Sequence, residues 1–216
     1  FGIAPDFRHH PLAVPNEHPA DTAKEMPAGS RISTEFVRLT ERYFAELGIE
    51  AWSFTAEVGG VALDPANATR TREEADGSPL RCPDPDAETA MIARIDEARS
   101  AGDTVGGVFE VVVHGLPIGL GSYVHWDRRL DAALAAAVMS INIVKGVEFG
   151  LGFEQTRRFG SAVHDIIDGR DDAGRWVHRT NNAGGLTGGV TNGEPLVVRG
   201  AVKPISTLAR PLASAD

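Results

Sequence analysis

The sequence has very little cysteine and no long apolar run, and each absence excludes a class of protein. Cys82 is the only cysteine, so no internal disulfide can form, and no cysteine–histidine spacing is typical of a structural zinc site. We therefore expect no metal and a reducing, cytoplasmic compartment. No apolar run approaches the length of a bilayer span, and no basic segment followed by a hydrophobic stretch opens the chain. A membrane is accordingly not an expected partner.

Positive charge is also in short supply. The chain has 21 Lys and Arg residues against 30 Asp and Glu, which gives a net charge of −9 at pH 7. Nonspecific binding to a polyanion depends on an excess of cationic side chains, so nucleic acid is not an expected partner. An anionic ligand would have to meet a local basic pocket.

Apolar residues are plentiful enough for a folded core. They make up 42% of the 216 residues, and their spacing predicts helices and strands that interleave along the chain. This order indicates an α+β or α/β class, and we assign α+β. The expected helices cover residues 33–47, 84–102 and 127–141, and the expected strands cover residues 49–58, 108–117, 145–153 and 195–201. In the second helix, the predicted apolar face holds Ala90, Ile92, Ile95 and Ala98.

The first thirty residues differ from the rest. They hold five of the thirteen prolines and show no sustained hydrophobic period, so we expect residues 1–30 to be irregular or disordered and residues 31–216 to form the domain. The chain begins at Phe1 and ends at Asp216 without an obvious boundary signal, which we interpret as processing or truncation.

A glycine-rich loop, residues 179–195, is the most unusual segment. Its sequence, RTNNAGGLTGGVTNGEP, contains five glycines and three asparagines. Such a stretch lets a backbone approach a ligand closely and can present amide N–H groups to an anion. Composition alone favours the simpler interpretation, a glycine-rich hairpin.

The order of several segments carries a more specific signal. These segments are RCPDPDAE (81–88), GDTVGG (102–107), EVVVHGLPIGLGS (110–122), ALAAAVMSINIVKGVEFGLGF (133–153), GSAVHD (160–165), the glycine-rich loop and VKPISTLARPL (202–212). Many glycine, proline and asparagine positions that agree in series are more specific than one motif. Together the segments resemble chorismate synthase over residues 35–216.

The resemblance implies a fold and an activity. The fold is the family's β-α-β sandwich, incomplete in this chain, and the assembly is a homotetramer. The activity is that of a carbon–oxygen lyase acting on phosphates, in the shikimate pathway of aromatic amino acid biosynthesis. It removes phosphate from 5-enolpyruvylshikimate-3-phosphate by 1,4-anti elimination and yields chorismate. The cofactor is reduced FMN, which is not consumed, and NADPH enters as a flavin reductant through the same resemblance.

The resemblance also implies residues that bind the flavin. Each has a simpler alternative: Asn142 could cap a helix whose next residue Ile143 packs in the core, Gly188 could be a turn glycine, and a Lys-Pro-x-Ser-Thr run could be a surface loop. With the family pattern we favour flavin contact, and we expect these positions to converge on one cavity. The implied flavin-binding residues are Asn142, Ile143, Gly188, Lys203, Pro204, Ile205, Ser206 and Thr207.

The match decays toward the N-terminus. Arg31 lies where the family places a substrate-binding arginine, and a solvent-exposed arginine at a helix start is the alternative. His18 lies one residue out of register with the family's His-Ala-Asp motif, whose histidine protonates the flavin, and a loop histidine is its alternative. The family's N-terminal Gly-Glu-Ser-His-Gly and C-terminal Arg-His-Asp segments do not occur. Two other functions therefore stay open: a noncatalytic remnant of the fold, and a flavin or nucleotide-phosphate binding module.

Overall fold

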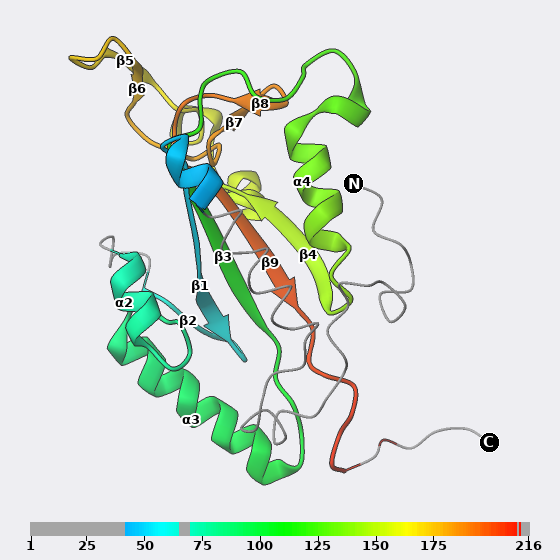
Figure 1. The fold of residues 1–216 in the computed structure, drawn as a ribbon. Helices are drawn as coiled ribbons and strands as arrows, with labels where there is room; N and C mark the ends of the chain where they lie inside the picture. The colour runs from blue at the N-terminus through cyan, green and yellow to red at the C-terminus, as the bar shows by residue number, and fades with distance from the viewer. Residues whose placement is uncertain (1–41, 65–69, 211, 213–216) are drawn as a thin grey trace. The chain divides into compact units, whose positions relative to one another are not determined.

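A computed structural model describes residues 42–64, 70–210 and 212 (Figure 1). The chain divides into two compact units, Phe1–Glu50 and Ala51–Asp216. In the first unit, residues 42–46 are helical, and Gly48, with φ of +72°, follows them in the left-handed conformation that commonly ends a helix. This is the last turn of the predicted helix over residues 33–47. Its earlier turns and the segment 1–30 lie outside the described residues.

A five-stranded sheet forms the centre of the second unit. Its strand order is β2-β1-β3-β9-β4, and β9 pairs antiparallel with both β3 and β4. Gly59 and Gly60, both with positive φ, join β1 to β2 as the two-residue hairpin of type I′ requires. The four predicted strands are confirmed with shifted ends: β1 is Glu50–Val58, β3 Gly107–His114, β4 Val144–Phe149 and β9 Leu196–Val202. The short strand β2, Val61–Ala62, was not predicted.

Helix α3 (Pro85–Ala101) begins and ends where local signals place it. Asp84 accepts the N–H groups of Asp86 and Ala87, and Gly102 closes the helix with φ of +70°. The predicted apolar face is confirmed only in part: Ile95 and Ala98 are half-buried, but Ala90 and Ile92 are exposed, and Met91 is the side chain that the core buries completely. A short helix, α2 (Arg72–Gly77), precedes α3, and α4 (Leu130–Met139) confirms the third predicted helix.

The two faces of the sheet bury two separate clusters. Alternation along β3 sends Val112 into the cluster with Phe54, Ala75 and Met91, which joins β1 to α2 and α3. The neighbouring Val113 packs in the second cluster, with α4 and the glycine-rich loop. The members of that second cluster include Leu130, Leu134, Val138, Val147, Phe149, Leu186, Leu196 and Val198. The sheet therefore holds α4 and the glycine-rich loop on one face.

Charged residues occupy three neighbouring strands on the other face. Arg199 of β9 lies directly opposite Glu110 of β3 and Glu148 of β4, and its Nη2 lies 3.3 Å from Glu148 Oε2. Burial raises the pKa of Glu110. The positive charges of Arg70 and Arg199 lower it by less, so the pKa stays above its ordinary value. This face thus carries a charged cluster beside the apolar cluster around Met91, whereas the first face is apolar.

The described part of the second unit also has two small hairpins and three short 3₁₀ helices. The 3₁₀ helices are η3 (Trp126–Arg128), η4 (Gly152–Arg157) and η5 (Gly160–Ala162). The hairpins pair β5 (Ile167–Arg170) with β6 (Trp176–His178), and β7 (Leu186–Thr187) with β8 (Val190–Thr191). The α+β class is confirmed. Within the described part of the chain, every helix is too short or too polar to cross a bilayer.

Candidate functional site

The lysine segment, residues 203–207, directly follows the end of β9. The N–H of Lys203 donates to the carbonyl oxygen of Ile143 at 3.0 Å, and Thr104 Oγ1 donates to the carbonyl oxygen of Ile205 at 2.7 Å. All five of its residues are exposed. The backbone of the segment is therefore tied to two other parts of the chain while its side chains face solvent.

The stretch GDTVGG supports the lysine segment from behind. A Cβ at Gly106 would lie 2.3 Å from the carbonyl oxygen of Val202 and 3.0 Å from Cδ of Pro204. Because such a contact is far inside van der Waals distance, the close approach requires glycine at this position. GDTVGG, one of the segments that resemble the family, thus has a physical role. It lets the end of β9 and the lysine segment lie against residues 104–106.

Asn142 and Ile143 connect α4 to β4. Ser140 is the residue that ends α4, and its N–H donates to carbonyl oxygens of the last turn. Asn142 is therefore not the cap, and Ile143, with 41% of its surface exposed, is not a core residue. The alternative interpretation, a helix cap at Asn142 followed by a core residue at Ile143, is wrong. The hydrogen bond to Lys203 instead brings the pair to the start of the lysine segment.

Gly188 lies at the opposite end of α4. It occupies the turn of the β7–β8 hairpin with φ of +64°, and the carbonyl oxygen of the next residue, Gly189, accepts the N–H of Leu130 at the start of α4 (Figure 1). A helix of ten residues spans about 15 Å. Asn142, Ile143 and the lysine segment lie together at one end of α4, whereas Gly188 lies at the other. In the described part of the chain α4 separates Gly188 from the other positions, and the single shared cavity stays a prediction.

Asp165 anchors the glycine-rich loop from outside. Its carboxylate accepts the N–H groups of Asn182 at 2.8 Å and Ala183 at 2.9 Å, and the hydroxyl of Thr180. Burial by itself raises the pKa of Asp165, but the hydrogen bonds from Thr180, Ala183 and Asn182 outweigh it and hold the pKa below its ordinary value. Asp165 is therefore a charged clamp on the loop backbone.

The backbone N–H groups at the start of the loop are already used. Those of Gly184 and Gly185 donate to the carbonyl and side-chain oxygens of Asn181, in addition to the two that Asp165 accepts. The expectation that this stretch presents its amides to an anion is wrong for residues 182–185. Its glycines serve close packing instead, because a Cβ at Gly184 would lie 2.3 Å from the backbone nitrogen of Gly150.

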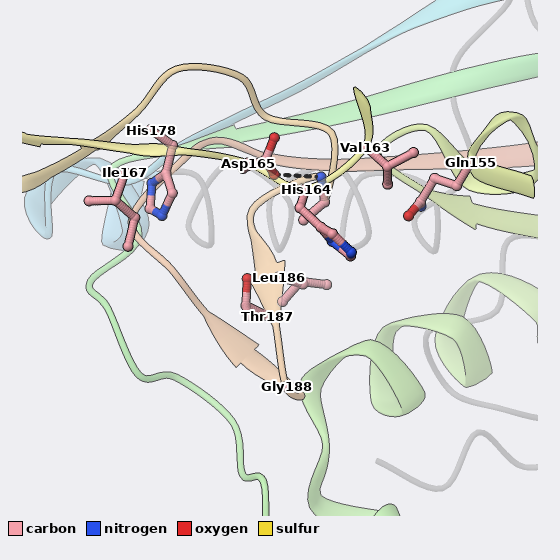
Figure 2. Close-up of a pocket in the computed structure, with 10 residues that line it drawn as sticks. Gln155, Val163, His164, Asp165, Ile167, His178, Leu186, Thr187 and Gly188 are labelled. Atoms are coloured by element: carbon pink, nitrogen blue, oxygen red, sulfur yellow. Dashed lines mark hydrogen bonds between the residues drawn. The ribbon is translucent and has the colours of Figure 1, made fainter. Parts of the chain in front are cut away.

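A cavity of about 390 Å³ opens beside the glycine-rich loop (Figure 2). Figure 2 shows the imidazole rings of His164 and His178 on the two sides of Leu186 and Thr187. The side chain of His178 is 11% exposed, and its Nδ1 lies 3.0 Å from Glu194 Oε1. Gly188 also lines this cavity, so one of the implied flavin contacts borders it.

The sequence did not predict the role of Asp165 or the contact between His178 and Glu194. Asp165 belongs to the quoted stretch GSAVHD, but nothing local indicates that its partners lie 15 to 18 residues further on. The contact of His178 with Glu194 spans 16 residues, again without periodicity. Among the residues that the structure describes, no three His, Cys, Asp or Glu side chains gather as a metal site would require. His18 and Arg31 lie outside the described residues.

The fold and site define an α+β protein in which an exposed lysine and two hydroxyls lie at one end of a helix, and a cavity that Gly188 borders lies at the other. A sequence model of the chorismate synthase family matches residues 31–216. The chain therefore belongs to the chorismate synthase family, and the resemblance read from the sequence is confirmed.

Individual relatives agree with this family. Chorismate synthase 1 of Bacillus thuringiensis (strain Al Hakam) and chorismate synthase 2 of Bacillus anthracis are each 52% identical over 182 residues, covering 82% of this chain and 46% of theirs. A crystal structure of chorismate synthase superposes with a TM-score of 0.72 at 41% identity, over 82% of this chain and 55% of that one. The chain thus spans about half the length of the curated relatives it matches.

Proposed function

We propose that this chain is the flavin-binding part of a chorismate synthase that uses reduced FMN. The complete reaction is the 1,4-anti elimination of phosphate from 5-enolpyruvylshikimate-3-phosphate, which yields chorismate. One observation carries the proposal for this chain: the Lys203 N–H donates to the Ile143 carbonyl, so two segments that the family pattern assigns to the flavin are adjacent. Family membership supports the rest.

The lysine segment fits the phosphate of FMN. An ammonium and two hydroxyls, from Lys203, Ser206 and Thr207, match the donors that a phosphate dianion requires, and all three residues are exposed. Lys203 has no carboxylate partner among the described residues, so its charge is available to a ligand. FMN is elongated, with its phosphate remote from its ring, so contacts at both ends of α4 are compatible with one molecule.

The reduced flavin would supply electron density to the departing C–O bond, and the protein would supply position and electrostatics. A triply anionic substrate calls for cations, for which Arg31 is our candidate, and His18 is our candidate proton donor. We infer a homotetramer and NADPH as a reductant from the family alone. The free, buried thiol of Cys82 suits a reducing compartment such as the cytoplasm.

A noncatalytic role is the second candidate, because the chain spans only 46% of its curated relatives. Incubation of the chain with FMN, dithionite and 5-enolpyruvylshikimate-3-phosphate separates the two, since turnover produces the absorbance of chorismate. Flavin binding without chorismate would support a flavin-binding remnant. Absence of both would contradict the proposed function.

Replacing Lys203 by Ala tests the flavin-phosphate site directly. Loss of one charge-assisted contact to a phosphate should weaken FMN binding by about 1.5 to 3 kcal/mol, or one to two decades in affinity. Folding should change little, because an exposed lysine contributes less than about 1 kcal/mol. Fluorescence titration measures the affinity, and thermal melts without flavin measure the fold.

Lys145→Ala is the matched control, because Lys145 is also exposed and lies on β4, close to the same end of α4. Its FMN affinity should equal that of the wild type. Equal affinities for Lys203→Ala and Lys145→Ala would remove Lys203 from the site, and a large drop in the melting temperature of Lys203→Ala would make its role structural.

A further inference from the structure

The cavity beside Gly188 is lined by a histidine, His178, that is not among the expected flavin-binding residues. His178 is the last residue of β6, its side chain is nearly buried, and it lines the cavity together with Thr187 and Leu186. Glu194, at the end of the glycine-rich loop, lies behind it. The carboxylate of Glu194 is itself positioned by its backbone, because its N–H donates to Asn192 Oδ1 at 3.0 Å.

Glu194 determines which imidazole nitrogen carries a proton. Its Oε1 accepts the backbone N–H of His178 at 3.0 Å and lies 3.0 Å from Nδ1 of the same residue. A carboxylate can only accept, so Nδ1 is the protonated nitrogen of the neutral ring. Nε2 is then the nitrogen left for a ligand: it accepts a hydrogen bond when the ring is neutral and donates one when the ring is protonated.

The other walls of the cavity suit a flat, partly apolar ligand. Val163, Ile167 and Leu186 supply apolar surface, and the open backbone at Gly188, where nothing lies within 4 Å of an ideal Cβ, leaves room for close approach. The phosphate donors lie at the far end of α4. A flavin anchored there by its phosphate would have its ring, rather than its phosphate, near this cavity.

We propose that His178, oriented by Glu194, contacts the polar edge of the flavin ring beside Gly188 and stabilises negative charge on the reduced ring. This inference rests on the proposed function, since it requires that the chain bind a flavin. The ring nitrogens and carbonyl oxygens of a flavin accept hydrogen bonds, and reduction adds negative charge to that edge. A protonated imidazole would donate to it through Nε2.

Other charged groups surround His178 and must be separated from its effect. Glu194 contacts it from the glycine-rich loop, Asp165 interacts with it electrostatically from the cavity wall, and His164 lines the same cavity. On the paired strand β5, Asp168 is bound to Arg179. All of these groups are present in both the wild type and a His178 variant, so the ratio of the two affinities reports the loss of His178 together with its contacts to Glu194 and Asp165.

The test titrates the 216-residue chain with reduced FMN and with reduced riboflavin, which lacks the phosphate, under dithionite at pH 7. His178→Gln should bind both flavins about tenfold more weakly than the wild type. Glu194→Gln should lose about threefold. His125→Gln, at an exposed histidine outside the cavity, should match the wild type throughout.

The riboflavin arm separates this inference from the proposed function. Lys203→Ala should weaken FMN binding and leave riboflavin unchanged, whereas His178→Gln should weaken both. Equal affinities of the wild type and His178→Gln would overturn the role of His178 and leave the phosphate site standing. Failure of the wild type to bind either flavin would overturn both. Should His178→Gln lower the melting temperature without flavin, the nearly isosteric Glu194→Gln decides the outcome by the same ratio.

Discussion

The glycine-rich loop and the lysine segment are held in opposite ways. In the loop, the backbone is held by the side chain of Asp165, which lies outside the loop, and by Asn181, which belongs to it. As a result, the N–H groups of residues 182–185 all have partners. In the lysine segment, two backbone groups are tied, at Lys203 and Ile205, and the side chains are exposed. The loop uses its polar groups to define its own shape, whereas the segment leaves its polar side chains exposed.

This difference predicts where substitutions act. In the loop, changes should appear first as lost stability, because the groups concerned hold the fold. In the lysine segment, they should appear as lost affinity at unchanged stability, because the side chains contact solvent in the free protein.

The largest expected effect is that of Gly184→Ala. Gly184 has φ of +66°, and a Cβ there would lie 2.3 Å from the backbone nitrogen and 2.7 Å from Cα of Gly150. Since backbone atoms cannot move aside cheaply, we expect a loss of about 3 kcal/mol or more in the free energy of unfolding. Urea denaturation measures it.

Gly188→Ala is the matched control within the same loop. Gly188 has a similar φ of +64°, but nothing lies within 4 Å of its ideal Cβ, so only the conformational cost of about 1 to 2 kcal/mol applies. A loss as large as that of Gly184→Ala would show that steric contact with Gly150 is not what makes glycine necessary at position 184.

A smaller effect on stability is expected from Asp165→Asn. The variant loses a charged acceptor of three hydrogen bonds, which should reduce the free energy of unfolding by about 1.5 to 3 kcal/mol at pH 7. The pKa of Asp165 is lowered in the folded state, so its contribution is present above the unfolded pKa of about 3.9 and is lost as the pH falls through the folded value.

The gap between wild type and Asp165→Asn should therefore stay constant from pH 7 to about pH 5 and shrink below about pH 4. Urea denaturation at several pH values measures this gap. Asp168→Asn, which removes an exposed partner of Arg179, is the control and should change stability less. A gap that persists unchanged at pH 3 would mean that the charge of Asp165 does not hold the loop.

The smallest expected effect on stability belongs to the double variant Ser206→Ala, Thr207→Val. Both residues are exposed, so the free energy of unfolding should change by less than about 0.5 kcal/mol. FMN affinity should fall by about three- to tenfold as neutral hydrogen bonds to the phosphate are lost. Riboflavin affinity should be unchanged. A stability loss comparable with that of Asp165→Asn would remove the contrast between the two regions.

The longer helices and strands of the second unit could be predicted because their signals are local, whereas α2, β2 and the two small hairpins were not. Asp84 and Gly102 act within one turn of the ends of α3, and Gly59-Gly60 directly follows the last residue of β1. The buried face of α3 could not be predicted in the same way. Which side chain meets the sheet depends on how the helix is rotated against β1 and β3, and Met91 is the residue that packing selects.

The sequence by itself determined the family, the positions of the main elements of the second unit and the position of the lysine segment. These could be found because they depend on ordered motifs and local caps along the chain. Only the tertiary structure decided that Asp165 consumes the loop amides, that Glu194 orients His178, and that α4 separates Gly188 from Lys203. The physical reason is distance along the chain. A hydrogen bond between positions 16 or 101 residues apart leaves no periodic trace, and it forms only after the sheet has brought its partners together.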